Sequence, residues 1–126
     1  MKKFYRCNIC GNLIAMVDDS GAVPVCCGET MHELKPNTTD AANEKHVPVV
    51  EVVNGKIKVT VGSVLHPMLP EHHIEWIYLL TKQGGYLKYL PVDGKPIAEF
   101  TIGDDELIAA YEYCNLHGLW KIDFKK

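Results

Sequence analysis

The sequence lacks any long apolar segment. No run approaches the roughly 18 apolar residues that a membrane-spanning helix requires. The residues before Cys7 include Lys2, Lys3 and Arg6, but they lack the apolar stretch that a secretory signal peptide carries. We therefore expect a soluble protein of the cytoplasm that has no membrane partner.

The sequence also has no excess of positive charge. It carries 13 Lys and Arg against 16 Asp and Glu, which gives a formal net charge of −3. Proteins that bind nucleic acids usually present a basic patch to the phosphates, so the charge argues against a nucleic-acid partner. With 126 residues, 47% of them hydrophobic, the chain can bury one modest core and a small additional unit, but not two large domains.

Cysteines are the most informative residues that the sequence does contain. The five cysteines are Cys7, Cys10, Cys26, Cys27 and Cys114. In a reducing compartment clustered cysteines more often bind metal than form disulfides, and an odd number argues further against a framework made only of disulfides.

The first four cysteines form a complete set of thiolate ligands. The two-residue spacing of Cys7 and Cys10 lets both sulfurs of one turn reach the same ion, and Cys26 and Cys27 complete the set. Four thiolates favour a tetrahedral ion, either zinc or iron, and the ligand types alone do not distinguish between the two metals. Because Cys26 and Cys27 are adjacent, we expect them to distort the tetrahedron.

We expect a first domain over residues 1–36, stabilised by this metal. A segment of that size falls below the about 40 residues at which a hydrophobic core alone usually suffices, so bound metal must supply the missing stability. The polar stretch 35–40 is typical of a linker. The second domain is then expected over residues 37–126.

The second domain is predicted to be mainly β. The Asn54-Gly55 pair accepts the positive φ angles of a tight turn and predicts a hairpin. Strands are expected at 47–53, 56–61, 74–81, 86–90, 97–102, 107–113 and 119–124. The segment 107–113 is also compatible with the start of a helix. Seven short strands separated by turn signals predict an antiparallel β-sandwich of the immunoglobulin-like type.

Four histidines of the second domain are candidate ligands for a second metal: His46, His66, His72 and His117. A proline-stiffened loop separates His66 from His72 and can present both imidazoles to one ion. In an extended strand His72, Ile74 and Trp76 share one face, so His72 is expected to point inward and His73 toward the solvent. Taken singly, each histidine is more often an ordinary polar residue than a ligand.

Cys114 is left over once the first site is filled, and His117 follows it by three positions. Backbone N–H groups of the intervening turn can donate to the thiolate sulfur. One thiolate with four imidazoles suits iron or another redox metal, whereas zinc usually stops at four ligands. Five ligands on an ion that takes six leave one position open, which is typical of a catalytic centre. A thiolate opposite that position pushes electron density toward whatever binds there.

The order of these motifs resembles that of the desulfoferrodoxin family, the two-iron form of superoxide reductase. The resemblance covers nearly the whole chain and rests on Cys7-x2-Cys10, Cys26-Cys27, Glu44-Lys45-His46-Val47-Pro48, His66-Pro67-Met68, His72-x-Ile74-x-Trp76-Ile77 and Cys114-Asn115-Leu116-His117-Gly118. It implies a desulforedoxin-like first domain with a distorted rubredoxin-type iron, and therefore iron rather than zinc at the four cysteines. It also implies a neelaredoxin-like second domain. The sequence departs from the family pattern at His73, where an aromatic residue is expected.

The resemblance further implies the roles of individual residues. The implied ligands of a second iron are His46, His66, His72 and His117 in a plane, with Cys114 axial. Glu44 is implied to bind the oxidised iron at the sixth position, and Lys45 to attract the anionic substrate. The implied activity is the one-electron reduction of superoxide to hydrogen peroxide. Rubredoxin or a similar donor would restore iron(II), and a homodimer is expected.

Two other functions remain open on the residues alone. An electron-transfer protein would use the same ligands only to store and pass electrons. A structural zinc module that binds a protein partner would be colourless, so visible colour distinguishes it from an iron protein.

Overall fold

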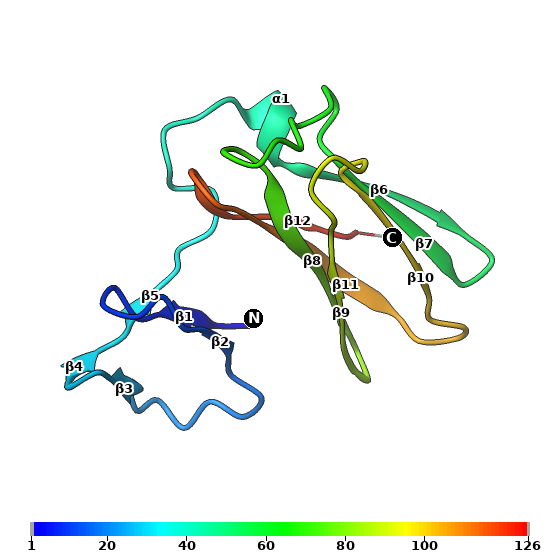
Figure 1. The fold of residues 1–126 in the computed structure, drawn as a ribbon. Coiled ribbons are helices and arrows are strands. Elements are labelled where there is room, and N and C mark those ends of the chain that lie inside the picture. Colours follow the sequence, from blue (N-terminus) through cyan, green and yellow to red (C-terminus); the bar gives the residue numbers. More distant parts are fainter. Residues whose placement is uncertain (1, 126) are drawn as a thin grey trace. The chain divides into compact units, whose positions relative to one another are not determined.

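The structure is a computed structural model that describes residues 2–125, and it divides into two compact units, Met1–Lys35 and Pro36–Lys126. Figure 1 shows the first unit in blue to cyan and the second in the remaining colours. Residues 2–125 contain no helix with the length and hydropathy that a bilayer crossing requires.

The first unit consists of very short antiparallel strands. They are β1 (Phe4–Arg6), β2 (Leu13–Ala15), β3 (Val25–Cys26), β4 (Glu29–Thr30) and β5 (His32–Glu33). Three of them form a sheet in the order β2-β1-β5, and the other two form the hairpin β3-β4. Strands of two or three residues are too short to show a hydrophobic period, which is why the sequence did not predict them.

The core of the first unit is small. Tyr5, Cys7 and Met31 are buried, and Ile14 and Met16 pack against them. A core of this size contributes little stability, so a bound metal is expected to add to it.

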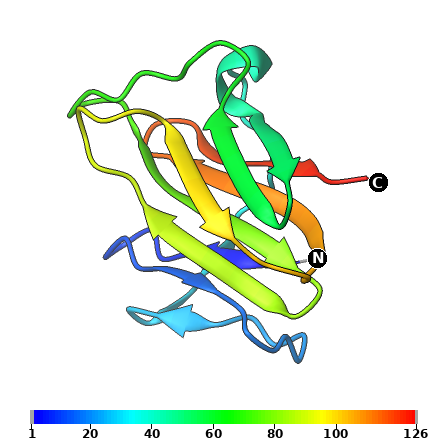
Figure 2. The same ribbon diagram turned by 90° about the vertical axis from the view of Figure 1, so that its right-hand side faces the viewer.

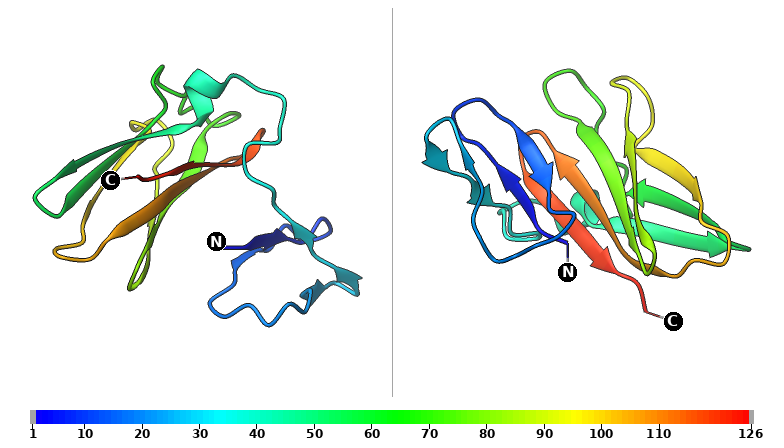
Figure 3. Two further views of the ribbon diagram at one scale, coloured as in Figure 1. Left: turned by 180° about the vertical axis from the view of Figure 1, so that it is seen from behind. Right: turned by 90° about the horizontal axis from the view of Figure 1, so that it is seen from below.

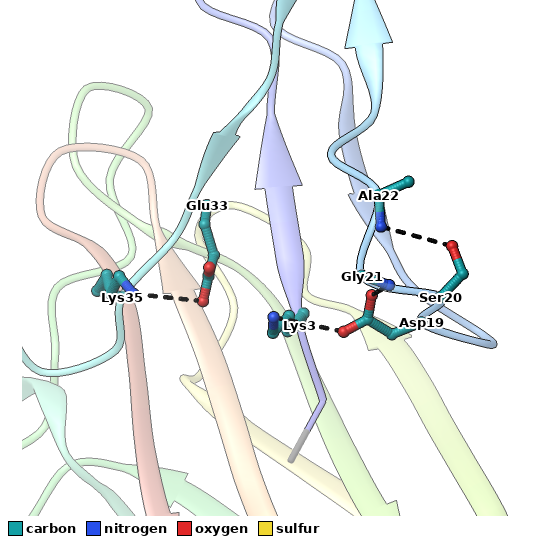
Figure 4. Close-up of polar contacts among 7 residues, drawn as sticks. All are labelled: Lys3, Asp19, Ser20, Gly21, Ala22, Glu33 and Lys35. Carbon is teal, nitrogen blue, oxygen red and sulfur yellow. Dashed lines mark hydrogen bonds and ion pairs between the residues drawn. The ribbon is translucent and has the colours of Figure 1, made fainter.

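Two ion pairs tie the surface of the first unit, as Figure 4 shows. The Lys3 ammonium lies 3.4 Å from the Asp19 carboxylate, and Lys35 lies 3.7 Å from Glu33. The Asp19 carboxylate also accepts a hydrogen bond of 2.8 Å from the Gly21 N–H. This N–H and the Lys3 ammonium lower the pKa of Asp19 because both favour the carboxylate.

The second unit is a sandwich of two antiparallel sheets. Its strands are β6 (Pro48–Val53), β7 (Lys56–Val61), β8 (Ile74–Thr81), β9 (Gly84–Tyr89), β10 (Ile97–Thr101), β11 (Leu107–Cys114) and β12 (Gly118–Asp123). One sheet has the order β10-β7-β6 and the other the order β12-β11-β8-β9. Figures 1 and 2 show the two sheets as separate layers. The mainly β, immunoglobulin-like prediction is confirmed, and the segment that was also compatible with a helix is the strand β11.

Turn chemistry and burial explain this fold. Asn54 and Gly55 have φ angles of 49° and 75°, as the predicted hairpin turn between β6 and β7 requires. The buried core fills the space between the sheets with side chains such as Val59 and Phe100 from one and Ile77 from the other. Each such fully buried apolar side chain contributes about 1.5–3 kcal/mol.

A β-bulge interrupts the pairing of β8 with β11. Tyr113 is opposite Trp76, but the next residue, Cys114, is opposite Ile74, so β8 carries one extra residue, Glu75. Ile74 therefore lies in the core with Cys114, whereas Trp76 stacks on Tyr113 at 5.7 Å between ring centroids. The expectation that Ile74 and Trp76 share one face is wrong, because the bulge shifts the alternation by one residue.

The polar stretch expected to be a linker is partly attached to the second unit. The Asn37 N–H donates to the Leu119 carbonyl at 3.1 Å, and its side chain forms two hydrogen bonds with the backbone of Lys121. Asn37, whose φ angle of 62° is left-handed, therefore fastens the stretch to the edge strand β12 by one backbone and two side-chain hydrogen bonds.

The only helix of the described residues is α1 (Asn43–His46), a single turn that leads into β6. The loop that precedes β8 and the turn between β11 and β12 lie at the same end of the sandwich as α1 (Figures 1 and 3). This end carries all five predicted ligands of the second metal.

Candidate metal centres

The four cysteines of the first unit converge. Their sulfur atoms all lie within 4.8 Å of one another. The Sγ atoms of Cys10 and Cys26 are 3.6 Å apart, and those of Cys26 and Cys27 are 3.9 Å apart. Metal–sulfur bonds of 2.3 Å give a tetrahedron with edges of about 3.8 Å. The sulfur positions therefore fit one tetrahedral ion.

Positive φ angles make this convergence possible. Gly11, Cys27 and Gly28 have φ angles of 84°, 54° and 77°, which turn the chain sharply after each cysteine pair. The Gly11 N–H donates to the Cys7 carbonyl at 3.0 Å and closes the first turn. Cys27, as a non-glycine residue in this conformation, is strained by its place beside Cys26.

The electrostatics of the four sulfurs favour a cation. Hydrogen bonds from the backbone N–H groups of Cys10 and Ile9 lower the pKa of Cys7 to about 6. Interactions with the thiols of Cys10, Cys26 and Cys7 raise the pKa of Cys27 to about 12. Four sulfurs at these distances cannot all be thiolates without a positive ion between them.

The second group comprises four imidazoles and one thiol from separate segments. His46 ends α1, His66 and His72 flank the loop before β8, and Cys114 and His117 flank the turn after β11. Donor atoms of His46, His72, Cys114 and His117 lie within 4.8 Å of one another. His66 joins them, since its Nε2 lies 3.2 Å from His46 Nε2 and 3.5 Å from Cys114 Sγ.

The imidazoles form a closed ring of four. Neighbouring rings meet nearly at right angles, with centroids 4.6–5.1 Å apart around the order His46, His66, His72 and His117. His46 and His72 face each other across the ring at 6.4 Å. His46 Nε2 lies 3.1 Å from His117 Nδ1. Adjacent nitrogens on an ion with bonds of about 2.1 Å would be about 3.0 Å apart, so these corners fit an equatorial plane.

The hydrogen bonds of the imidazoles indicate which nitrogens carry a proton and which present a lone pair to a cation. The Nδ1 atoms of His46 and His66 lie 2.8 and 2.7 Å from the carbonyls of Ala42 and Pro67. Because a carbonyl only accepts, both Nδ1 atoms carry the proton and both Nε2 atoms present lone pairs to each other. His72 Nε2 is buried without a hydrogen-bond partner. Converging lone pairs of this kind need a shared metal ion.

Burial favours the neutral form of three of the imidazoles. It lowers the pKa of His66 to about 4 and also lowers those of His46 and His72. Neutral imidazoles are the form that binds metal, so these three side chains are available as ligands at neutral pH.

Cys114 is fully buried, and opposing effects act on the pKa of its thiol. Burial raises the pKa of the Cys114 thiol, whereas hydrogen bonds from the N–H groups of Leu116 and His117 lower it. The buried Glu112 carboxyl on the same strand also raises it. A thiolate in this place therefore depends on a metal ion for its stability, and the turn supplies the N–H donors that were expected.

The helix α1 holds His46 and carries the two charged residues implied by the resemblance. Glu44 and Lys45 are exposed, and neither belongs to the group of converging donor atoms. The Glu44 carbonyl accepts a hydrogen bond of 2.8 Å from the Val64 N–H. A Cβ atom on Gly62 would lie 2.6 Å from that carbonyl oxygen, so only glycine lets α1 pack this closely.

The structure separates His72 from His73. The His73 ring is half-buried and donates through Nδ1 to the Leu69 carbonyl at 2.9 Å, outside the group. Sequence reasoning did not assign a role to Trp120, which stacks on the His46 ring at 4.9 Å and donates to the His117 carbonyl at 3.1 Å. Its position two residues after Gly118 gave no indication of these contacts.

Comparison with known proteins gives consistent matches to both units. The family profile of the desulfoferrodoxin N-terminal domain matches residues 1–34, and that of desulfoferrodoxin matches residues 38–123. Desulfoferrodoxin from Nitratidesulfovibrio vulgaris is 48% identical over 121 residues, which cover 96% of this chain and 95% of that protein.

Solved structures agree with these matches. The superoxide reductase from Treponema pallidum superimposes with a TM-score of 0.82 at 44% identity and covers 98% of this chain and 99% of its own. The superoxide reductase (1Fe-SOR) from Giardia intestinalis superimposes with a TM-score of 0.55 at 31% identity, over 66% of this chain and 99% of its own. With both profiles and a full-length relative in agreement, the chain belongs to the desulfoferrodoxin family.

Proposed function

We propose that the chain is a superoxide reductase, which reduces superoxide by one electron to hydrogen peroxide and so removes it from the cell. The observation that carries this proposal is the ring of four imidazoles with a buried thiol beside it, whose donor atoms converge on one another while His72 Nε2 is buried without a hydrogen-bond partner. The reaction consumes one superoxide, one electron and two protons, and it releases one hydrogen peroxide.

We assign one mononuclear iron to each unit. The proposed ligands of the first iron are Cys7, Cys10, Cys26 and Cys27, in a domain over residues 1–36. The proposed ligands of the second iron are His46, His66, His72, Cys114 and His117, in a domain over residues 37–126. The sulfur and nitrogen distances support these sets, as does the family to which the chain belongs.

The protein contributes positions and charges to the reaction. Iron(II), when bound in the second unit, supplies the electron that superoxide accepts. The neutral imidazoles leave the positive charge of the ion available to an anion. The Leu116 and His117 N–H groups hold the thiolate of Cys114 in place and moderate its electron density.

We assign Lys45 to substrate attraction, and Glu44 is the residue that would bind the iron in its oxidised state. Both residues are exposed on α1, next to His46, and the packing of α1 on Gly62 fixes the backbone from which they extend. An ammonium group near a cationic site raises the local concentration of a small anion. Lys45 also orders the water that delivers protons to the product.

The remaining proposals concern the surroundings of the protein. An external donor of the rubredoxin type returns the electron to the second iron. The protein is cytoplasmic, which its clustered free cysteines support, since a reducing compartment protects such thiols. It forms a homodimer, and exposed Val17, Val23 and Val25 of the first unit offer apolar surface that a second copy would cover.

The test combines metal analysis with product measurement. We expect two irons per chain with two distinct visible and electron paramagnetic resonance spectra. With an electron donor and a superoxide source, one hydrogen peroxide should form per superoxide without release of dioxygen. Two irons without peroxide formation would indicate an electron-transfer protein, and a colourless zinc protein would indicate a structural module.

A further inference from the structure

The backbone of His72 forms hydrogen bonds, whereas the Nε2 atom of its ring forms none. The Nε2 atom is buried without a partner, and the residue lies in the loop that precedes β8. Leu69 and His72 pair as an isolated bridge, with N–H to carbonyl distances of 2.9 and 3.1 Å. The position of the imidazole therefore depends on what holds the segment 71–73.

Asn115 holds this segment on both sides of His72. Its side-chain Oδ1 accepts from the His73 N–H at 2.9 Å, and its Nδ2 donates to the Glu71 carbonyl at 3.1 Å. Its own backbone N–H donates to the His73 carbonyl at 3.2 Å. One residue thus makes three hydrogen bonds to the two neighbours of His72.

Asn115 is also linked through the backbone to two other donors of the second group. Asn115 directly follows Cys114 and precedes His117 by two positions, in the turn that presents both donors. Its contacts begin where the strand pairing ends, since Cys114 opposite Ile74 is the last pair of β11 with β8. Asn115 therefore continues this pairing by one step, on the far side of the β-bulge at Glu75.

We propose that Asn115 is a positioning residue of the second centre, which sets the distance of the His72 imidazole from Cys114 and His117. Only a side chain with one donor and one acceptor at this length can bond the Glu71 carbonyl and the His73 N–H together. The inference rests on the proposed function only in that the five donors hold a metal.

Asn37 provides a control for the loss of such hydrogen bonds, and its φ angle of 62° means that alanine there also strains the backbone. Its side chain also donates to one carbonyl and accepts from one N–H, both of Lys121 on β12, at 3.1 and 2.8 Å. Replacing either asparagine by alanine removes the same kinds of hydrogen bond. Only Asn115 borders the ligands.

The first measurement uses the metal-free full-length protein. Amide hydrogen exchange of the segment 69–74 should accelerate in Asn115→Ala and remain unchanged in Asn37→Ala. Equal exchange in Asn115→Ala and the unaltered protein would overturn the proposal.

The second measurement uses the iron-loaded protein and a chelator in excess. The iron affinity of the second centre, followed by its thiolate-to-iron absorption as the chelator competes, should be about 10–100-fold lower in Asn115→Ala, the usual effect of removing a residue that orients a metal ligand. The four-cysteine centre shares no ligand with it and serves as an internal reference. Asn115→Asp keeps the acceptor for the His73 N–H, so its retention of iron should lie between that of Asn115→Ala and that of the unaltered protein.

Iron loss and absorption like those of Asn37→Ala would show that Asn115 is merely structural. If Asn115→Ala does not fold, Asn115→Asp decides by the same comparison. These results stand apart from the proposed function, because iron retention and hydrogen exchange are measured without superoxide.

Discussion

Single residues decide which donors face the second metal. His72 and His73 are neighbours, yet only His72 has a buried nitrogen aimed into the ring, while His73 donates to the Leu69 carbonyl. His72→Ala should abolish the thiolate-to-iron absorption of the oxidised second centre, because one corner of the plane is lost. His73→Ala should leave that absorption in place. Visible spectra of both variants after equal iron loading make the comparison, and the reverse pattern would exchange the two assignments.

The exposed charge of Lys45 should act on the rate of encounter with superoxide. Lys45→Ala should lower the second-order rate constant by roughly tenfold and weaken its dependence on salt, because the attraction of the anion is lost. Pulse radiolysis at several ionic strengths measures both effects.

Lys56 supplies the control for this prediction. It begins β7 beside the Asn54-Gly55 turn, at the end of the β6-β7 hairpin opposite to α1. Lys56→Ala changes the net charge equally and should leave the rate constant nearly unchanged. If Lys45→Ala and Lys56→Ala lower the rate constant equally, the net charge of the protein determines the rate and the position of Lys45 does not.

At the level of elements, the contact between α1 and the turn after β7 sets the place of His46. Gly62→Ala would bring a Cβ within 2.6 Å of the Glu44 carbonyl oxygen and within 3.0 Å of that of Val47. Backbone atoms cannot yield as a flexible side chain does, so α1 must shift. We expect a loss of about 1–3 kcal/mol in stability and a weakened second centre.

Urea unfolding and iron retention test this prediction. Gly94→Ala is the control, because its Cβ would meet Pro91 Cγ at 3.0 Å and the Pro91 carbonyl oxygen at 3.1 Å in a turn that carries no ligand. A Gly62→Ala protein that keeps both its stability and its second iron would mean that α1 tolerates displacement.

Asp105 joins two connections of the second unit. Its Oδ1 accepts from the N–H groups of Gln83 and Glu106, at 3.1 and 2.8 Å. Partial burial raises the pKa of Asp105, but hydrogen bonds from Thr81, Glu106, Gln83 and Tyr86 outweigh it, so the pKa lies below its usual value. The carboxylate is therefore favoured by folding.

The sign of its pH dependence follows. A carboxyl whose pKa is lowered on folding contributes stability above its unfolded value near 3.8, and this contribution is lost as the pH falls through the lower folded value. Asp105→Asn should lower the urea midpoint at pH 7 and have progressively less effect below about pH 3.8.

The elements also show what the sequence could and could not predict. Alternating apolar residues and the Asn54-Gly55 turn were sufficient for the strands of the sandwich other than β11, whose segment was also compatible with the start of a helix and is buried along nearly its whole length. The strands of the first unit and α1 are too short to show a period. The bulge at Glu75 has no sequence marker, since it arises from how β8 meets β11.

For the candidate sites, too, the sequence predicted one part and not the other. Cysteine and histidine types and spacing were sufficient to group the donors, but the residues that orient them were missed. The carbonyls of Ala42 and Pro67 orient His46 and His66, and a backbone carbonyl carries no residue-specific mark. Trp120 and Asn115 likewise act through contacts that only the folded chain creates.

On the scale of the whole molecule, each unit has its own core and its own group of donors. A fragment of residues 37–126 should therefore fold, bind one iron and form hydrogen peroxide from superoxide at an unchanged rate. A relative that matches only two thirds of this chain, yet nearly all of its own length, supports this expectation. Circular dichroism, iron analysis and peroxide measurement on the fragment provide the test.

Replacing Cys10 in the full chain tests whether the first iron takes part in turnover. Cys10→Ser removes one sulfur of the first group and should eliminate its spectrum while leaving peroxide formation from added iron(II) protein intact. If turnover with an external donor also falls, the first iron relays electrons. If the fragment of residues 37–126 does not fold, the first unit is needed for the stability of the second.

The two groups of donors differ in how far apart their members lie along the chain, and this bears on the order in which a newly made protein acquires its metals. Cys7 and Cys26 are 19 residues apart, whereas His46 and His117, whose nitrogens nearly touch, are 71 apart. Short loops close early during synthesis, which proceeds from the N-terminus. The four cysteines can thus gather metal on a nascent chain, while the imidazole ring cannot exist before β11 and the turn behind it have been made. Iron in the second unit therefore marks a chain whose sandwich has already closed.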